Sequence, residues 1–139
     1  CTADQQTVKS RLLAPLLSPT ASVAAAASKV ALDLQSVLHA DGSWADVNYT
    51  DKSRGTWATI DHLSRIENIA VAVRSPLSPT ANSSSLLASA NAALRFWLRG
   101  GFTNPNWYWN EIGVPQSLAN TFLLLEGRVR HPDPSVSRA

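Results

Sequence analysis

Apolar residues recur every three or four positions along most of the chain, which is the spacing of one helix face and differs from the alternation of a strand. Clusters of Pro, Gly and Ser separate the segments that carry this pattern. The sequence therefore predicts an all-α fold of about five helices, arranged as helical hairpins whose connecting loops lie at the ends of the layer. The predicted helices cover residues 4–17, 20–38, 57–74, 83–100 and a last segment that starts at Pro115.

The apolar stripe of each segment predicts the face that packs into the core. A Thr20 cap begins the second segment, and Gly100 and Gly101 end the fourth. The predicted inward residues are Val23, Ala27, Val30, Leu34 and Val37 in the second helix, Trp57, Ile60, Leu63, Ile66, Ile69 and Val73 in the third, Leu86, Leu87, Ala90, Ala93, Leu94, Trp97 and Leu98 in the fourth, and Leu118, Phe122, Leu125 and Val129 in the fifth.

Length and charge narrow the class of protein. With 139 residues, 45% of them hydrophobic, the chain fits one helical domain over residues 1–130. The tail 131–139 holds two prolines and no apolar stripe, so it is expected to be extended or disordered. Because the 12 basic and 10 acidic residues are scattered, a nucleic-acid partner is not expected. Lys29 and Asp33 break the longest apolar stretch, so no membrane insertion is expected.

The start of the chain and two sequons favour a secreted, extracellular glycoprotein. The chain begins at Cys1 with no initiator methionine, and Asn48 and Asn82 open Asn-X-Ser/Thr acceptor sites. Two alternatives stay open, because such short patterns also arise by chance and a trimmed chain also lacks methionine. Cys1 is the single cysteine, so it either links two chains or stays free.

Three adjacent aromatic residues lie in the connection 100–114, which reads as a loop. Indole and phenol rings exposed on a loop suit sugars, because the apolar C–H face of a pyranose packs flat on a ring while its hydroxyls reach polar groups. The alternative is that the two tryptophans cap a hairpin as core residues. The candidate glycan-binding rings are those of Trp107, Tyr108 and Trp109. The side-chain amides of Asn104, Asn106 and Asn110 could bond sugar hydroxyls, and the guanidinium groups of Arg95 and Arg99 could donate to a carboxylate or sulfate of an acidic sugar.

The stretch NWYWNEIGVPQSLANTFLLL resembles the Asn-Trp-Trp-x-x-Glu-Ile-Gly-x-Pro segment of polysaccharide lyase family 8, the hyaluronate, chondroitin AC and xanthan lyases. A second block, LHADGSWADVNYTDKSRGTWATIDHLSRIENIAVA, is similar to the family's Asp-Gly-Ser-Trp and His-Leu-x-Arg stretch. Together they cover about residues 38–126. The resemblance implies the first hairpins of the (α/α) toroid that forms the catalytic domain of these enzymes.

The resemblance also implies where the substrate lies. In the family the Asn-Trp-Trp segment lines the cleft; Asn106 and Trp107 match it, while Tyr108 stands where a second Trp is common. The family's catalytic Asn, His, Tyr and Arg follow that segment and have no counterpart here, so no catalytic residue, cofactor or metal is expected. His62 matches a family histidine whose expected role is a packing hydrogen bond. A calcium loop is the less favoured interpretation of Asp41, Asp46, Asn48 and Asp51, because their spacing does not fit.

Two functions fit these observations. The favoured one is a short secreted protein without catalysis that binds an acidic polysaccharide or cell-surface glycan, with an immunomodulatory role allowed. The alternative is the N-terminal fragment of a full lyase that cleaves uronic-acid polysaccharides by β-elimination. A third reading is a self-associating bundle without a sugar site. Because a partial toroid leaves helix faces uncovered, a homodimer is expected, with Cys1 as a candidate link.

Overall fold

The computed structural model describes residues 2–126, which form five α-helices and one isolated β-bridge between Leu38 and Trp44. The predicted all-α class is therefore confirmed. The predicted tail 131–139 lies outside the described residues. The helices are α1 (Ala3–Leu13), α2 (Ala21–Ser36), α3 (Asp61–Arg74), α4 (Ser84–Gly100) and α5 (Val114–Leu125), with 3₁₀ turns at Ala14–Leu16 and Ala58–Ile60 and a π-helical turn at Trp109–Gly113.

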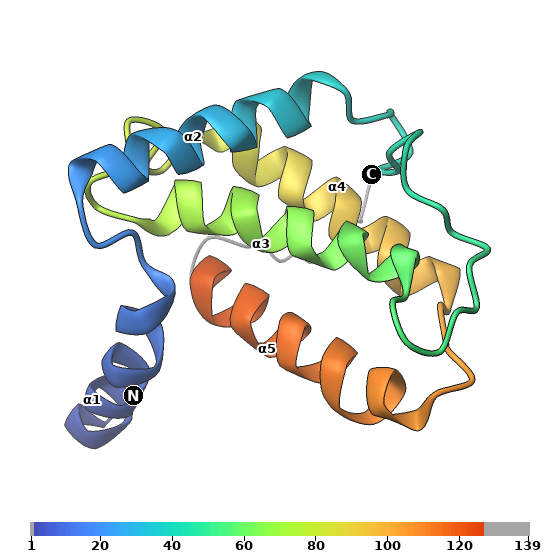
Figure 1. The fold of residues 1–139 in the computed structure, drawn as a ribbon. Helices are drawn as coiled ribbons and strands as arrows, with labels where there is room; N and C mark the ends of the chain where they lie inside the picture. The colour runs from blue at the N-terminus through green and yellow to red at the C-terminus, as the bar shows by residue number, and fades with distance from the viewer. Residues whose placement is uncertain (1, 127–139) are drawn as a thin grey trace, which may run out of the picture.

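Helix α3 lies at the centre of the molecule and packs against α2, α4 and α5 (Figure 1). From α2 to α5, successive helices run in opposite directions, while α1 lies to one side near the end of α5 (Figure 1). This alternation brings the two long connections, residues 37–57 and 101–113, to the same end of the bundle. The expectation that hairpin connections gather at the ends of the helices is met there.

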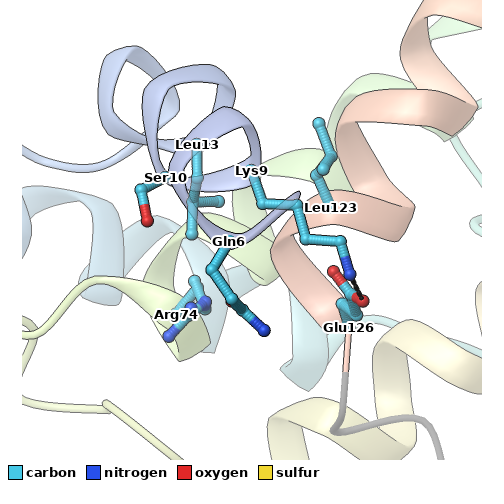
Figure 2. A pocket seen from close by; sticks show the side chains of 7 residues that line it. All are labelled: Gln6, Lys9, Ser10, Leu13, Arg74, Leu123 and Glu126. Atoms are coloured by element: carbon cyan, nitrogen blue, oxygen red, sulfur yellow. Dashed lines mark hydrogen bonds and ion pairs between the residues drawn. The ribbon is translucent and has the colours of Figure 1, made fainter. Parts of the chain in front are cut away.

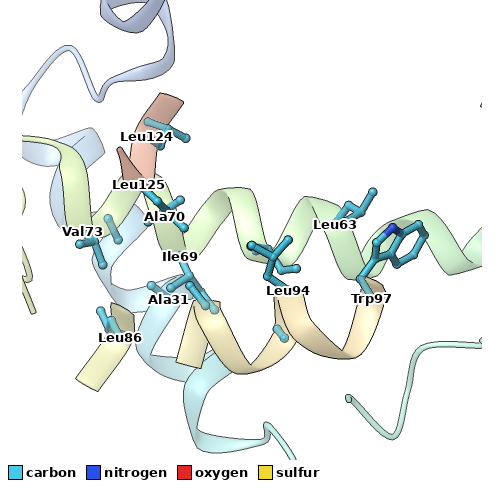
Figure 3. Close-up of a cluster of buried hydrophobic side chains, with 14 of the residues drawn as sticks. Ala31, Leu63, Ile69, Ala70, Val73, Leu86, Leu94, Trp97, Leu124 and Leu125 are labelled. Carbon is cyan, nitrogen blue, oxygen red and sulfur yellow. The ribbon is translucent and has the colours of Figure 1, made fainter. Parts of the chain in front are cut away.

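The core forms around α3, whose buried side chains follow the predicted spacing of three and four residues. Leu63, Ile66, Ile69 and Val73 are all at most 1% exposed. Figure 3 shows Leu86, Leu94 and Trp97 of α4 facing them, with Leu124 and Leu125 of α5 nearby. Burying one such aliphatic side chain stabilises the fold by about 1.5–3 kcal/mol. The packing of these helices therefore follows directly from the apolar pattern.

The predicted inward face of α2 is wrong for its valines, whereas Leu34 is half-buried against the core as expected. Val23, Val30 and Val37 are 47%, 45% and 57% exposed, and the buried residues are Ala24, Ser28 and Ala31. The small side chains let α2 approach α3 closely, which larger valines would prevent. The buried polar member of this face, Ser28, shares a 2.6 Å hydrogen bond with Ser78. Leu98 and Phe122, also expected inside, are 57% and 48% exposed.

A buried hydrogen-bond chain fastens the connection 37–57 to the core. His62 Nε2 lies 2.7 Å from the Ala93 carbonyl, which only accepts, so Nε2 carries the proton and Nδ1 accepts from the Tyr49 hydroxyl at 2.8 Å. Tyr49 in turn accepts the Trp44 N–H at 3.0 Å. Burial lowers the pKa of His62 and raises the pKa of Tyr49. The neutral His62 thus makes the packing hydrogen bond expected of it.

Gly42 allows the same connection to lie against α4. Its φ of +92° belongs to the left-handed region that favours glycine. A Cβ atom at this position would lie 2.2 Å from the Ala92 carbonyl oxygen, which is far inside contact distance. The Asp-Gly-Ser-Trp motif is therefore explained by a close backbone approach at Gly42, followed by the buried Trp44, whose Nε1 donates to the Leu34 carbonyl at 3.0 Å.

Candidate functional site

The aromatic stretch is helical, which corrects the expectation of a loop up to Pro115. The helical turn starts at Trp107, passes through the π-helical turn Trp109–Gly113 and continues into α5. Asn106 caps this start, because its Oδ1 accepts the N–H of Tyr108 at 3.1 Å. Short π-helical turns inside helices are frequent at functional sites. The three aromatic side chains therefore belong to a helical element and not to a loop.

Three asparagines hold this element in place. Asn104 is 4% exposed; its N–H donates to Asn110 Oδ1 at 2.8 Å, and its carbonyl accepts from Asn110 Nδ2 at 2.7 Å. The Asn104 Nδ2 donates to the Ser53 carbonyl at 2.9 Å, and Asn106 Nδ2 donates to the Arg54 carbonyl at 2.8 Å. These amides were expected to bond a sugar. In the structure they bond the chain itself and join the two long connections.

Trp109 faces the core, unlike its two neighbours. Its indole Nε1 donates to the Arg54 carbonyl at 3.2 Å, and its ring centroid lies 6.0 Å from that of Trp57. Gly113 leaves room for the ring, since a Cβ atom there would come within 2.8 Å of Trp109 Cε3. The glycine of the Glu-Ile-Gly motif thus has a packing explanation. The tryptophans were expected either to bind a sugar or to pack against the core, and Trp109 packs against the core.

Trp107 and Tyr108 lie at the surface. Trp107 is 61% exposed and Tyr108 is 43% exposed, and their rings meet edge to face with centroids 6.5 Å apart. Tyr108 also contacts the anchored Trp109 ring at 5.4 Å. Large rings that are exposed, adjacent and fixed from behind form an apolar surface that loses little conformational freedom on binding.

Two basic residues on the segment that holds Asn106 and Trp109 were missed by the sequence reasoning. Arg54 is exposed and its carbonyl holds both Asn106 and Trp109, while Lys52 Nζ donates to the Thr103 carbonyl at 2.7 Å. Asp51 shapes their turn: hydrogen bonds from Ser53 and from the Ala58 N–H lower the pKa of its carboxyl. The signal in the sequence was the Asp-Lys-Ser-Arg-Gly run, which became informative only through its contact with residues 103–109.

Arg99 lies at the same end of the bundle, on the last turn of α4. Its Nη2 is 3.5 Å from the Asp41 carbonyl, on the connection 37–57. Glu111 is also exposed on the π-helical turn and adds one negative charge to this end. The charges at this end of the bundle are thus mixed: the cations Lys52, Arg54 and Arg99 accompany the carboxylates of Asp41, Asp51 and Glu111.

The remaining predicted residues lie at the surface. Asn48 and Asn82 are both exposed, and Asn48 Oδ1 accepts the Thr50 hydroxyl at 2.9 Å. Within residues 2–126, no three His, Cys, Asp or Glu side chains gather closely enough to hold a metal ion. The carboxyl of Asp41 instead bonds Ser43 at the turn before Trp44, which lowers its pKa. Cys1 lies outside the described residues.

Comparison with known proteins identifies the chain's relatives. Residues 3–137 match the sequence model of polysaccharide lyase family 8, N terminal alpha-helical domain. The chain belongs to this family. Chondroitinase-AC of Pedobacter heparinus is 27% identical to it over 124 residues, which are 89% of this chain and 17% of that protein. The family resemblance of the two motifs is therefore confirmed.

The structural comparison agrees with the sequence comparison. A solved structure of chondroitinase AC lyase, from work on enzyme–oligosaccharide complexes and mutagenesis, superposes with a TM-score of 0.80 at 26% identity. The match covers 93% of this chain and 18% of that chain. The family 8 chain thus spans less than one fifth of the length of either relative. Among its described residues, no helix is long and apolar enough to cross a membrane.

Proposed function

We propose that this family 8 domain binds an acidic polysaccharide at the end of the bundle formed by residues 51–54 and 103–113. The single observation that carries this proposal is the pair of exposed rings, Trp107 and Tyr108, on a helical start fixed by Asn104 and by the half-buried Trp109. The relative is named for its action on chondroitin, an acidic polysaccharide, which supports the same ligand class.

In this proposal the two rings form the stacking platform and the cations select a charged sugar. Arg54 and Arg99 offer forked donors that match a carboxylate or sulfate, and Lys52 adds a point charge. Asn106 and Asn110 contribute by holding the platform, and each amide retains unused capacity for a sugar hydroxyl. Trp109 acts from behind, as the anchor of Tyr108.

We further propose that the domain by itself binds without cleaving. A β-elimination needs a base at the C5 proton and an acid at the leaving oxygen. The Tyr49 and His62 pair, 2.8 Å apart, is committed to the buried hydrogen-bond chain and does not reach the platform residues. In the second candidate function, the domain forms one wall of a longer lyase whose other parts supply this chemistry. The share of chondroitinase-AC that it matches, 17%, favours that candidate.

Secretion and dimer formation are part of the proposal. The exposed positions of Asn48 and Asn82 suit glycan attachment in an extracellular protein. Exposed valines recur every seven residues at Val23 and Val30 of α2 and at Val37, its C-terminal cap, and this stripe suits burial against a second copy. Glycosidase treatment that leaves the mass of secreted protein unchanged would refute the first statement. Light scattering that gives a monomer mass would refute the second.

The binding experiment compares three proteins. Chondroitin oligosaccharides are titrated into the unmodified chain, Trp107→Ala and Phe122→Ala, with calorimetry as the readout. Phe122 is the matched control, because it is an exposed aromatic residue on the same helix beyond the π-helical turn. A sugar ring that covers half of the exposed Trp107 surface removes roughly 75 Å² from water, worth about 2 kcal/mol or a ~30-fold change in affinity.

The outcomes separate the candidate functions. Binding that weakens about 30-fold in Trp107→Ala only, with no rise in the ultraviolet absorbance of unsaturated uronate products, supports binding without cleavage. Steady product formation by the chain alone would refute that part of the proposal. Equal affinity in all three proteins would refute the role of the aromatic platform in binding. Absence of binding to the unmodified chain would refute the proposed glycan-binding function.

A further inference from the structure

A hollow lies where α1 crosses the ends of α3 and α5. It is a cleft of about 230 Å³ whose walls come from three helices (Figure 2). Arg74, the last residue of α3, forms one wall, and α1 covers it from the other side (Figure 2). The lining residues are Gln6, Lys9, Ser10, Leu13, Arg74, Leu123 and Glu126.

Arg74, which lines this cleft, carries an unsatisfied donor. Its Nε is buried and makes no hydrogen bond, and it is the one such side-chain atom among residues 2–126. A buried donor without a partner costs about 1–3 kcal/mol, and more when it belongs to a charged group. Buried polar groups in native proteins are nearly always paired, so an exception calls for a ligand, an ion or a water molecule.

The other charges of the cleft leave Arg74 available. Lys9 Nζ forms an ion pair with Glu126 Oε1 across the rim, which joins α1 to the end of α5 (Figure 2). These two charges compensate each other. The positive charge of Arg74 is therefore the uncompensated one in the cleft, and its planar fork matches the two oxygens of a carboxylate.

We propose that this cleft binds a small hydroxylated carboxylate, with Arg74 on the carboxyl group. Gln6 and Ser10 supply hydrogen-bonding groups for hydroxyls, while Leu13 and Leu123 offer apolar surface to the carbon chain. Drug-sized pockets measure about 300–1,000 Å³, so a hollow of about 230 Å³ suits a molecule of a few carbon atoms.

This site is separate from the proposed polysaccharide site. Helix α3 begins at Asp61, at the end that holds the aromatic platform, and finishes at Arg74. At 1.5 Å per residue its 14 residues span about 20 Å. Ligand binding at one end therefore leaves the other end open, and the failure of one proposal leaves the other standing.

The test follows the Nε–H signal of Arg74 by NMR in the full chain. Burial protects this proton from exchange, and the signal is assigned by its loss in Arg74→Lys. Sodium gluconate, a hydroxylated carboxylate, is compared with sorbitol, which has hydroxyls only, and with sodium chloride at equal ionic strength. We expect gluconate alone to shift the signal, with saturation and a dissociation constant on the order of 1 mM.

A second variant keeps the result independent of folding. Arg95→Gln removes an exposed cation from α4 and should leave the gluconate titration unchanged, while Arg74→Gln should abolish saturable shifts at neighbouring amides of α1. If Arg74→Gln does not fold, the titration of the unmodified chain with gluconate, sorbitol and sodium chloride still tests the proposal. An unchanged Arg74 signal, or equal shifts with sorbitol or sodium chloride, would overturn the proposal in favour of water alone.

Discussion

Replacing Gly113 by alanine tests whether the π-helical turn and the ring of Trp109 are packed as described. The backbone at Gly113 is helical, with φ −60° and ψ −53°, so the substitution itself causes no backbone strain. The added Cβ atom, however, would lie 2.8 Å from Cε3 and 3.3 Å from Cζ3 of the Trp109 ring. Real Cβ atoms do not approach a ring carbon at 2.8 Å, so the ring or the helix has to move.

The ring has little freedom to move, because the Arg54 carbonyl and Trp57 hold it. Because the ring is held, overpacking here should lie in the upper part of its usual range, at about 2–3 kcal/mol, while the better helix propensity of alanine returns about 1 kcal/mol. The expected net loss is therefore roughly 1–2 kcal/mol, or about 3–8 °C in melting temperature for a chain of this size. Displacement of Trp109 should also shift Tyr108 and weaken polysaccharide binding.

The assay is urea unfolding followed by tryptophan fluorescence, with Gly55→Ala as the matched control. A Cβ atom at Gly55 meets nothing within 4 Å, so that variant should unfold like the original chain. If Gly113→Ala is as stable as the original, or more stable, the ring does not lie against Gly113 and the packing argument fails.

Three further outcomes follow from named contacts. Tyr49→Phe should lower the unfolding free energy by about 1–3 kcal/mol, because it leaves His62 Nδ1 and the Trp44 N–H without a hydrogen-bond partner. Tyr108→Phe, at an exposed residue, should change the unfolding free energy very little. Since burial lowers the pKa of His62, the unfolded chain binds the extra proton below about pH 6.5, so stability should fall from pH 7 to 5, with a shallower slope in His62→Gln. Arg54→Gln should weaken chondroitin binding and reduce its salt dependence, whereas Arg11→Gln, which removes an exposed cation from α1, should change neither; equal salt dependences in the two variants would contradict the charge argument.

The helices of the core were predictable because their apolar period is unbroken. The stripe of α3 from Leu63 to Val73 is buried as its spacing predicts. The buried face of α2 was not predictable in this way, because its sequence offers two stripes. One consists of valines and the other of alanines and a serine, and hydrophobicity alone favours the valines. Close approach of two helices favours small side chains, and only the tertiary structure decides between these effects.

The candidate site was predictable in its residues but not in its geometry. Three asparagines near three aromatic residues read as a loop, whereas Asn106 is a helix cap and Asn104 is a buried clamp to Ser53. Arg54 and Gly113 gained their meaning from contacts with Trp109, which sequence spacing does not reveal. The Arg74 cleft was invisible for the same reason, since its walls come from three separate helices.

The most direct test of the proposed polysaccharide site follows the indole N–H signals by NMR while chondroitin oligosaccharides are added. Trp107 should show a saturable shift, because its ring is exposed and forms part of the proposed platform. Trp44 and Trp57 serve as internal controls, since their indole N–H groups are buried and donate to the carbonyls of Leu34 and Asp51. A silent Trp107 signal, or equal shifts at all three, would contradict binding at the aromatic platform.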